Sequence, residues 1–211
     1  MLPFLRGASS REPSALPLFP LKTVLFPGGV LPLKVFEQRY VTMTKDCLRD
    51  ERPFGVCLLT RGEEVGDAAK VKAELAFAPI GTLARIVSWD MPQLGILHLR
   101  TEGETRFQVK THSVGDDGLV TGQVVALSPE PACKLPEQFK PLANFLDLLI
   151  SRVGKENFAP DQAPDDASWV GYRLAELLPL PLGIKQSMLE INDAGVRLDV
   201  LSQFLARQGL I

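Results

Sequence analysis

Short apolar runs broken by proline and glycine dominate the first part of the chain. Residues 16–36 read LPLFPLKTVLFPGGVLPLKVF, in which Val, Leu and Phe alternate with turn-forming residues. Proline cannot donate a ladder hydrogen bond, so it is confined to strand ends and edge strands. The pattern therefore predicts short strands joined by tight turns.

One amphipathic helix is expected directly after these strands. Phe36, Tyr40, Met43 and Cys47 recur at helical spacing, while charged residues fall between them. This spacing places the apolar side chains on one face that packs against a sheet. Pro53 marks the end of the helical region.

Strand-like composition returns in five further segments. They are residues 54–60, 77–89, 95–102, 105–114 and 119–127. The triplet Asp116-Asp117-Gly118 is typical of a hairpin turn, because Asp and Gly tolerate the positive φ values that such turns require. These segments predict an antiparallel sheet or a barrel-like sandwich.

The apolar period changes from two to about 3.6 residues after a proline-rich stretch that ends at Pro136. We place a boundary here and predict a flexible tail at 1–14, a β subdomain at 15–128 and a helical bundle at 129–211. The expected fold class is α+β. Candidate helix caps and terminators are Asp165, Asp166, Ser168, Asp193, Gly154 and Gly209.

Composition excludes several classes of protein. Hydrophobic residues make up 45% of the 211 residues and charged residues 23%, which is ordinary for a globular protein. The formal net charge of -2 supplies no general attraction for phosphate backbones or anionic lipid. No apolar run approaches the roughly 20 residues of a membrane helix. We expect a cytoplasmic protein whose three cysteines are buried, reduced thiols.

No motif along the chain supports catalysis. Gly154-Lys155 resembles part of a phosphate-binding loop, but Glu156 stands where Ser or Thr would bind magnesium. His98 and His112 have no neighbouring metal ligand at a suitable spacing. The sequence therefore predicts a protein that is not an enzyme and that has no catalytic residue, metal site or cofactor.

Residues 16–40, which continue the first apolar segment through EQRY, resemble the opening of the Lon protease N-terminal domain, also called the Lon substrate-binding domain. The resemblance continues in GTLARI at 81–86, in GETRFQV at 103–109 and in LAELLPLPLGIKQSMLEIND at 174–193. It therefore extends over almost the whole chain after the first dozen residues.

This resemblance implies a PUA-like β pseudobarrel with one helix, followed by a helical bundle. In full-length Lon enzymes this region helps to capture substrate proteins, and ATPase and serine-lysine protease domains follow it. The 211 residues do not include those domains. The resemblance thus predicts a non-catalytic module that binds hydrophobic or unfolded protein segments, with a protease or chaperone as possible partner.

Two groups of apolar residues are candidates for contact with such a segment. Trp89 and Met91 fall in a predicted turn, where an aromatic ring and a flexible thioether can meet a partner. Phe19, Phe26 and Tyr40 lie in the stretch that carries the family resemblance. A purely structural role in the barrel is the alternative for both groups.

RNA binding is an alternative function, because PUA-like barrels resemble modules that hold structured RNA. It requires Arg85, Arg100, Arg106 and Lys110 to gather on one face of the sheet. The acidic net charge argues against nucleic acid as a partner. A small enzyme with a site that no motif reveals is a third alternative.

Overall fold

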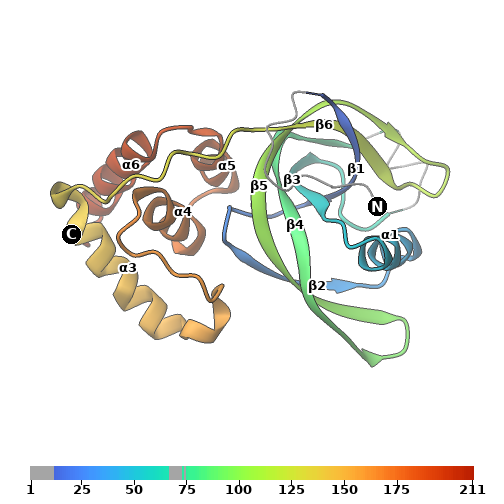
Figure 1. Cartoon of the computed structure of the whole chain (residues 1–211), viewed down its shortest axis with the longest axis horizontal. Coiled ribbons are helices and arrows are strands. Elements are labelled where there is room, and N and C mark those ends of the chain that lie inside the picture. Colours follow the sequence, from blue (N-terminus) through green and yellow to red (C-terminus); the bar gives the residue numbers. More distant parts are fainter. Residues whose placement is uncertain (1–11, 67–72, 74) are drawn as a thin grey trace.

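The computed structural model describes residues 12–66, 73 and 75–211, and it confirms the α+β class. A six-stranded sheet curls into a near-closed barrel with one helix, and a group of helices follows it in the sequence (Figure 1). Most of the predicted N-terminal tail lies outside the described residues. The division at 128 and 129 stays a prediction.

The barrel half contains six strands and helix α1. Its elements are β1 (Ser14–Leu21), β2 (Val30–Val35), α1 (Gln38–Arg49), β3 (Phe54–Arg61), β4 (Ala76–Gln93), β5 (Ile96–Val114) and β6 (Val120–Ala126). The strand order is β2-β5-β4-β3-β1-β6, and pairing of β5 with β6 closes a ring that leaves β2 outside. β1 and β3 run parallel, whereas the other pairs are antiparallel, so the sheet is mixed.

The predicted break between residues 102 and 105 is wrong, because β5 passes through this region without interruption. Gly103 is needed there for a close approach of backbones. Its amide donates to the Gly29 carbonyl at 2.8 Å, and its carbonyl accepts from Gly28 at 2.7 Å. A Cβ atom at position 103 would overlap the carbonyl oxygen of Phe26.

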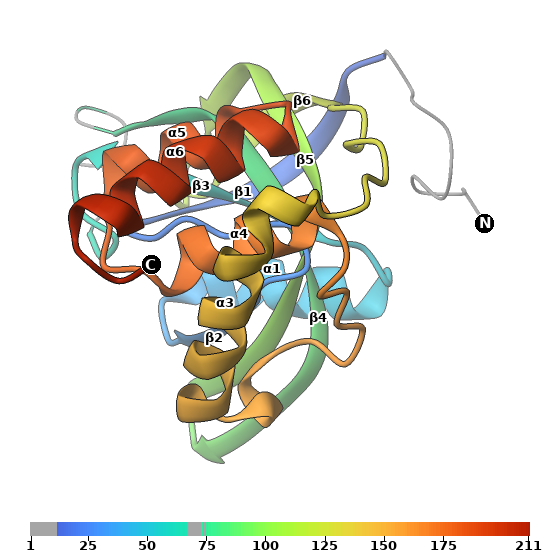
Figure 2. The same cartoon turned by 90° about the vertical axis from the view of Figure 1, so that its left-hand side faces the viewer.

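The helical half consists of α3 (Lys140–Val153), α4 (Ala167–Leu177), α5 (Leu182–Glu190) and α6 (Ala194–Arg207), with short 3-10 turns at Glu137–Phe139 and Lys155–Asn157. Figure 2 shows these helices stacked against one side of the barrel. The Asp166 carboxylate accepts from the Trp169 amide at 2.8 Å and the Asp193 carboxylate from the Val196 amide at 3.0 Å. Both residues are therefore the N-caps that the sequence predicts.

One of the three hydrophobic clusters among the described residues spans the two halves. Val24, Phe26, Leu58 and Ala78 of the barrel half pack in the same cluster as the buried faces of the helices. A buried guanidinium ties the halves together as well: Arg173 of α4 donates to the Pro27 carbonyl at 2.9 Å and also to that of Gly28. The barrel and the helices therefore support one another.

Glu130 lies in the segment between β6 and the helices. It accepts hydrogen bonds from side chains of the helical half and forms ion pairs with arginines of both halves. Its carboxylate lies 3.6 Å from Arg106 of β5, accepts from Arg197 of α6 at 3.0 Å and from Ser168 at 2.7 Å, and also accepts from the Tyr172 hydroxyl. Burial alone would raise the pKa of Glu130. The hydrogen bonds from Arg197, Ser168 and Tyr172 outweigh burial, so its pKa lies below the ordinary value.

Candidate functional site

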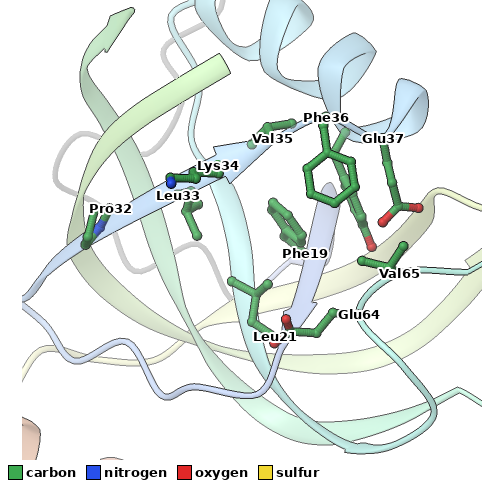
Figure 3. A pocket seen from close by; sticks show the side chains of 11 residues that line it. Phe19, Leu21, Pro32, Leu33, Lys34, Val35, Phe36, Glu37, Glu64 and Val65 are labelled. Atoms are coloured by element: carbon green, nitrogen blue, oxygen red, sulfur yellow. The ribbon is translucent and has the colours of Figure 1, made fainter. Parts of the chain in front are cut away.

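A pocket of about 180 Å³ opens where β2 meets α1 (Figure 3). We call it the β1–β2 pocket. Most of its lining residues are apolar or aromatic, polar and apolar atoms contribute about equally to its surface, and the residues come from three separate segments of the chain. The lining residues are Phe19, Leu21, Pro32, Leu33, Lys34, Val35, Phe36, Glu37, Tyr40, Glu64 and Val65.

The pocket exists because the sheet is incomplete at this place. Pairing of β1 with β6 ends at Leu18, so residues 19–21 of β1 pair with β3 alone. β2 pairs with β5 alone. The first turn of α1 and the segment after β3 supply the remaining walls.

Aromatic stacking forms the floor of the pocket. The rings of Phe19 and Tyr40 are stacked with centroids 3.9 Å apart, and the Arg39 guanidinium lies 4.6 Å from the centroid of the Tyr40 ring. Burial raises the pKa of Tyr40 to about 12, so the phenol is uncharged at neutral pH. The floor therefore offers an aromatic surface without a negative charge of its own.

Two large apolar side chains lie exposed at the mouth of the pocket. Phe36 is 54% exposed and Val65 is 53% exposed. The helical spacing of Phe36 with Tyr40 predicts a buried residue, which is wrong because Phe36 precedes α1. Val65 is the single apolar residue of RGEEVGD at 61–67, a polar, glycine-punctuated stretch that indicates a solvent-exposed loop, and it is the local signal for this part of the pocket.

The charged groups near the pocket are held by specific contacts. Arg39 is only 5% exposed, forms an ion pair with Glu37 at 2.8 Å and donates to the Gly118 carbonyl at 3.1 Å. The Glu64 carboxylate accepts a hydrogen bond from the Lys22 amide. Lys34 is exposed on the β2 side of the pocket, opposite Glu37 and Glu64 (Figure 3).

The structure brings together two of the five predicted contact residues. Phe19 and Tyr40 both line the β1–β2 pocket. Phe26 is fully buried and packs against the ring of Tyr172, with centroids 5.7 Å apart, so it has no surface to offer a partner.

Trp89 and Met91 are exposed, but they do not lie in a turn. Both belong to β4, and the turn begins three residues after Met91, at Leu94 and Gly95. The β4–β5 hairpin extends beyond the barrel (Figure 1). Leu94 at its tip is 94% exposed, a residue that the sequence does not single out.

Trp89 lies on the same face of the sheet as Leu33, a residue that lines the pocket. Trp89 and Leu33 are both cross-strand partners of Leu99, and paired residues point to the same face of a sheet. Leu33 lines the pocket. The hairpin residue Trp89 therefore continues the sheet face that begins at the pocket.

The structure does not gather the basic residues that RNA binding requires. Arg106 is 4% exposed and donates to the Leu189 carbonyl at 2.6 Å. Arg100 donates to the Phe158 carbonyl at 3.1 Å, and Arg85 pairs with Glu102 at 2.6 Å. Arg106 and Arg100 therefore serve contacts between the two halves, and the charge of the exposed Arg85 is offset by Glu102 and Glu104.

The described part of the chain contains no group of three or more His, Cys, Asp or Glu side chains that could hold a metal ion. Cys47 and Cys57 are buried, as expected, whereas Cys133 is exposed because it lies in the segment that connects the two halves. In the described ranges no helix is both long and apolar enough to cross a membrane.

Comparisons with known proteins agree with this fold. A family model described as the ATP-dependent protease La (LON) substrate-binding domain matches residues 15–207. The crystal structure of a Lon N-terminal domain protein from Xanthomonas campestris is 38% identical, with a TM-score of 0.71, and the match covers 92% of this chain and 98% of that one. The N-terminal domain of Lon protease from Mycobacterium avium complex is 16% identical with a TM-score of 0.57, covers the same 92% and 98%, and supports the fold alone.

Lon protease 2 of Myxococcus xanthus is 30% identical over 207 residues, which are 93% of this chain and 24% of that enzyme. The chain thus spans about a quarter of the length of this relative, and the catalytic domains of Lon proteases lie outside the aligned region. The match over residues 15–207 covers nearly the whole chain. The chain belongs to the Lon substrate-binding domain family.

Proposed function

We propose that this chain is a non-catalytic recognition module that binds hydrophobic or unfolded segments of other proteins in the β1–β2 pocket. The observation that carries the proposal is a pocket with an aromatic floor and two exposed apolar side chains, Phe36 and Val65, at its mouth. Exposed apolar groups around a concavity are typical of a protein contact site. The description of the family as substrate-binding agrees with a protein ligand.

The size of the pocket favours one side chain of a larger partner. Pockets that enclose drug-sized molecules measure roughly 300–1,000 Å³. A volume of about 180 Å³ is smaller than that range. A Leu, Phe or Met side chain from an extended segment suits this space, and the apolar residues of the β4–β5 hairpin offer further contact area nearby.

Binding of a permanently unfolded protein tests the proposal. Reduced, carboxymethylated α-lactalbumin with a fluorescent label serves as the probe, and fluorescence anisotropy gives its affinity. Phe36→Ser should weaken binding at least about fivefold, because truncating a central apolar contact costs more than about 1 kcal/mol. Leu148→Ser on α3 is the matched control, since Leu148 is 62% exposed and lies on the helical half.

Equal affinity of the two variants would remove the pocket from the binding surface. The double substitution Trp89→Ala with Met91→Ala tests the hairpin in the same assay, and an unchanged affinity excludes the hairpin from the contact area. Failure of the wild-type protein to bind any unfolded protein, together with salt-sensitive binding of single-stranded RNA, would reverse the choice between protein and RNA.

A further inference from the structure

Two unpaired strand edges border the β1–β2 pocket. β2 has a hydrogen-bonded neighbour on one side only, and so do residues 19–21 of β1. Both segments line the same pocket. The cavity is therefore a gap in the sheet, bordered by strands whose backbone groups have no strand partner on that side among the residues that the structure describes.

The orientation of β2 follows from its contacts with β5. The carbonyl of Gly29 accepts from Gly103 at 2.8 Å, and the carbonyl of Leu31 accepts from the Thr101 hydroxyl at 2.8 Å. Backbone groups alternate direction along a strand. The odd-numbered residues thus face β5, and Val30, Pro32 and Lys34 direct their backbone groups to the outer edge, where a proline is tolerated.

The β1 side of the gap shows how its backbone is satisfied without a strand. The Lys22 amide donates to the carboxylate of Glu64, a side chain that also lines the pocket. In a continuous sheet the carbonyl of a neighbouring strand would accept this kind of hydrogen bond. A side chain therefore accepts from the backbone directly after the end of β1, at the border of the pocket.

We propose that the bound segment is an extended peptide that adds a strand to the outer edge of β2 and inserts one apolar side chain into the β1–β2 pocket. This inference rests on the proposed function and specifies its binding mode. The peptide pairs with the N–H groups of Val30 and Lys34 and with the carbonyl of Pro32. Backbone pairing gives affinity without a strict sequence, and the pocket selects one apolar residue.

The charged side chains around the pocket indicate which residues the peptide carries next to its apolar anchor. Together with Pro32 they also argue against a second copy of this chain as the ligand. Of the two acidic side chains that line the pocket, Glu37 is paired with Arg39, whereas the Glu64 carboxylate accepts from the backbone amide of Lys22, so Glu64 supplies the negative charge for a ligand. A basic residue next to the apolar anchor complements it. Pro32 and Lys34 oppose pairing of two β2 edges, because proline removes a donor and the lysines of two copies repel.

The test uses a labelled nine-residue peptide, KSVSFSVSK, in which phenylalanine is the anchor. Single backbone N-methyl groups are placed at each position in turn. Strand addition predicts at least a tenfold loss of affinity at alternate positions and little change at the positions between them, because only every second amide faces β2. Replacing both lysines by glutamate should weaken binding about threefold at low salt and less at high salt.

A pair of protein variants tests the same contact from the other side. Lys34→Pro removes the outward N–H of β2, whereas the control Lys34→Ala removes only the side chain. We expect about tenfold weaker binding for Lys34→Pro and a change within about threefold for Lys34→Ala.

The outcomes separate this inference from the proposed function. Peptide binding that requires Phe36 but tolerates every N-methyl group, with equal affinities for the Lys34 variants, would overturn strand addition and leave the proposed function standing. No binding of the peptide or of the unfolded protein would overturn both.

Discussion

Replacing Glu130 by glutamine should destabilise the whole chain, although the residue belongs to no helix or strand. The substitution keeps the shape of the side chain and removes its charge. The guanidinium groups of Arg106 and Arg197 then remain buried without a counter-ion, since their side chains are 3% and 0% exposed. Both arginines still donate to backbone carbonyls, which limits the loss but does not neutralise the charge.

The expected loss is about 3 kcal/mol in the free energy of unfolding. Removing one partner of a buried ion pair costs roughly 3–5 kcal/mol, and the lower end applies here because the single amide oxygen of glutamine still accepts a hydrogen bond from either Ser168 or Tyr172. For a domain of about 200 residues, 1 kcal/mol lowers Tm by roughly 2–4 °C. The predicted decrease in Tm is therefore about 6–12 °C.

Urea denaturation followed by tryptophan fluorescence and circular dichroism measures this loss. Glu137→Gln is the matched control, because Glu137 forms an ion pair with Lys140 at 2.7 Å but is 84% exposed. Exposed pairs of this kind contribute about 0–1 kcal/mol. The control should therefore unfold within about 0.5 kcal/mol of the wild type.

The pH dependence provides a second check on the same carboxylate. The pKa of Glu130 in the folded state is below the ordinary value of 4.5. A lowered folded-state pKa means that the contribution of the carboxylate to stability is fully present above pH 4.5 and is lost as pH falls through the folded pKa. The stability curves of the wild type and Glu130→Gln should converge in acid. A loss below about 1 kcal/mol at pH 7, or a difference that persists at acid pH, would refute the argument.

Two smaller predictions concern packing and thiols. Gly103→Ala should destabilise the protein by about 1–3 kcal/mol, because its methyl group meets backbone, whereas Gly183→Ala in α5 has open space and should stabilise by about 0.5–1 kcal/mol; thermal melts of both variants decide this. Ellman's reagent should titrate Cys133 rapidly in the folded protein and all three cysteines in guanidinium, because burial raises the pKa of Cys47 to about 11 and of Cys57 to about 12. Rapid reaction of all three thiols in the folded state would contradict the burial of Cys47 and Cys57.

Local signals in the sequence predict the elements whose causes are local. Asp166 and Asp193 cap helices, and Gly154 and Gly118 have positive φ, because each of these roles depends only on neighbouring residues. The break expected near Gly103 is wrong for the complementary reason. A glycine that ends a strand and a glycine that admits a distant backbone have the same identity, and only the fold distinguishes them.

The positions of the buried arginines are also not predictable from the local sequence. Arg106, Arg173 and Arg197 are at most 4% exposed, although arginine is among the residues most often found at the surface. Their partners are carbonyls and a carboxylate that lie 67 or more residues away in most cases. Any hypothesis that places Arg106 on a basic surface therefore fails for a reason that the local sequence does not contain.

The candidate site is partly predictable. Phe19 and Tyr40 belong to the segment with the family resemblance, and they form the floor of the β1–β2 pocket. Val65 and Glu64 come from a loop that has no apolar pattern. Three segments of the chain meet at the pocket, and their meeting depends on the closure of the ring, which no single segment specifies.

The closure of the ring also determines when the chain can fold during synthesis. β1 pairs with β6 through registers such as Leu16 with Gly122, so more than a hundred residues must leave the ribosome before this pairing forms. Leu16 and Leu18 are almost fully buried in the final structure. Until β6 is made, their side chains remain exposed to solvent on the side that β6 later occupies. Contacts so distant in sequence form slowly, and exposed apolar strands of this kind are the ones that chaperones retain. A nascent chain of this family is thus, for a short time, an unfolded apolar segment itself.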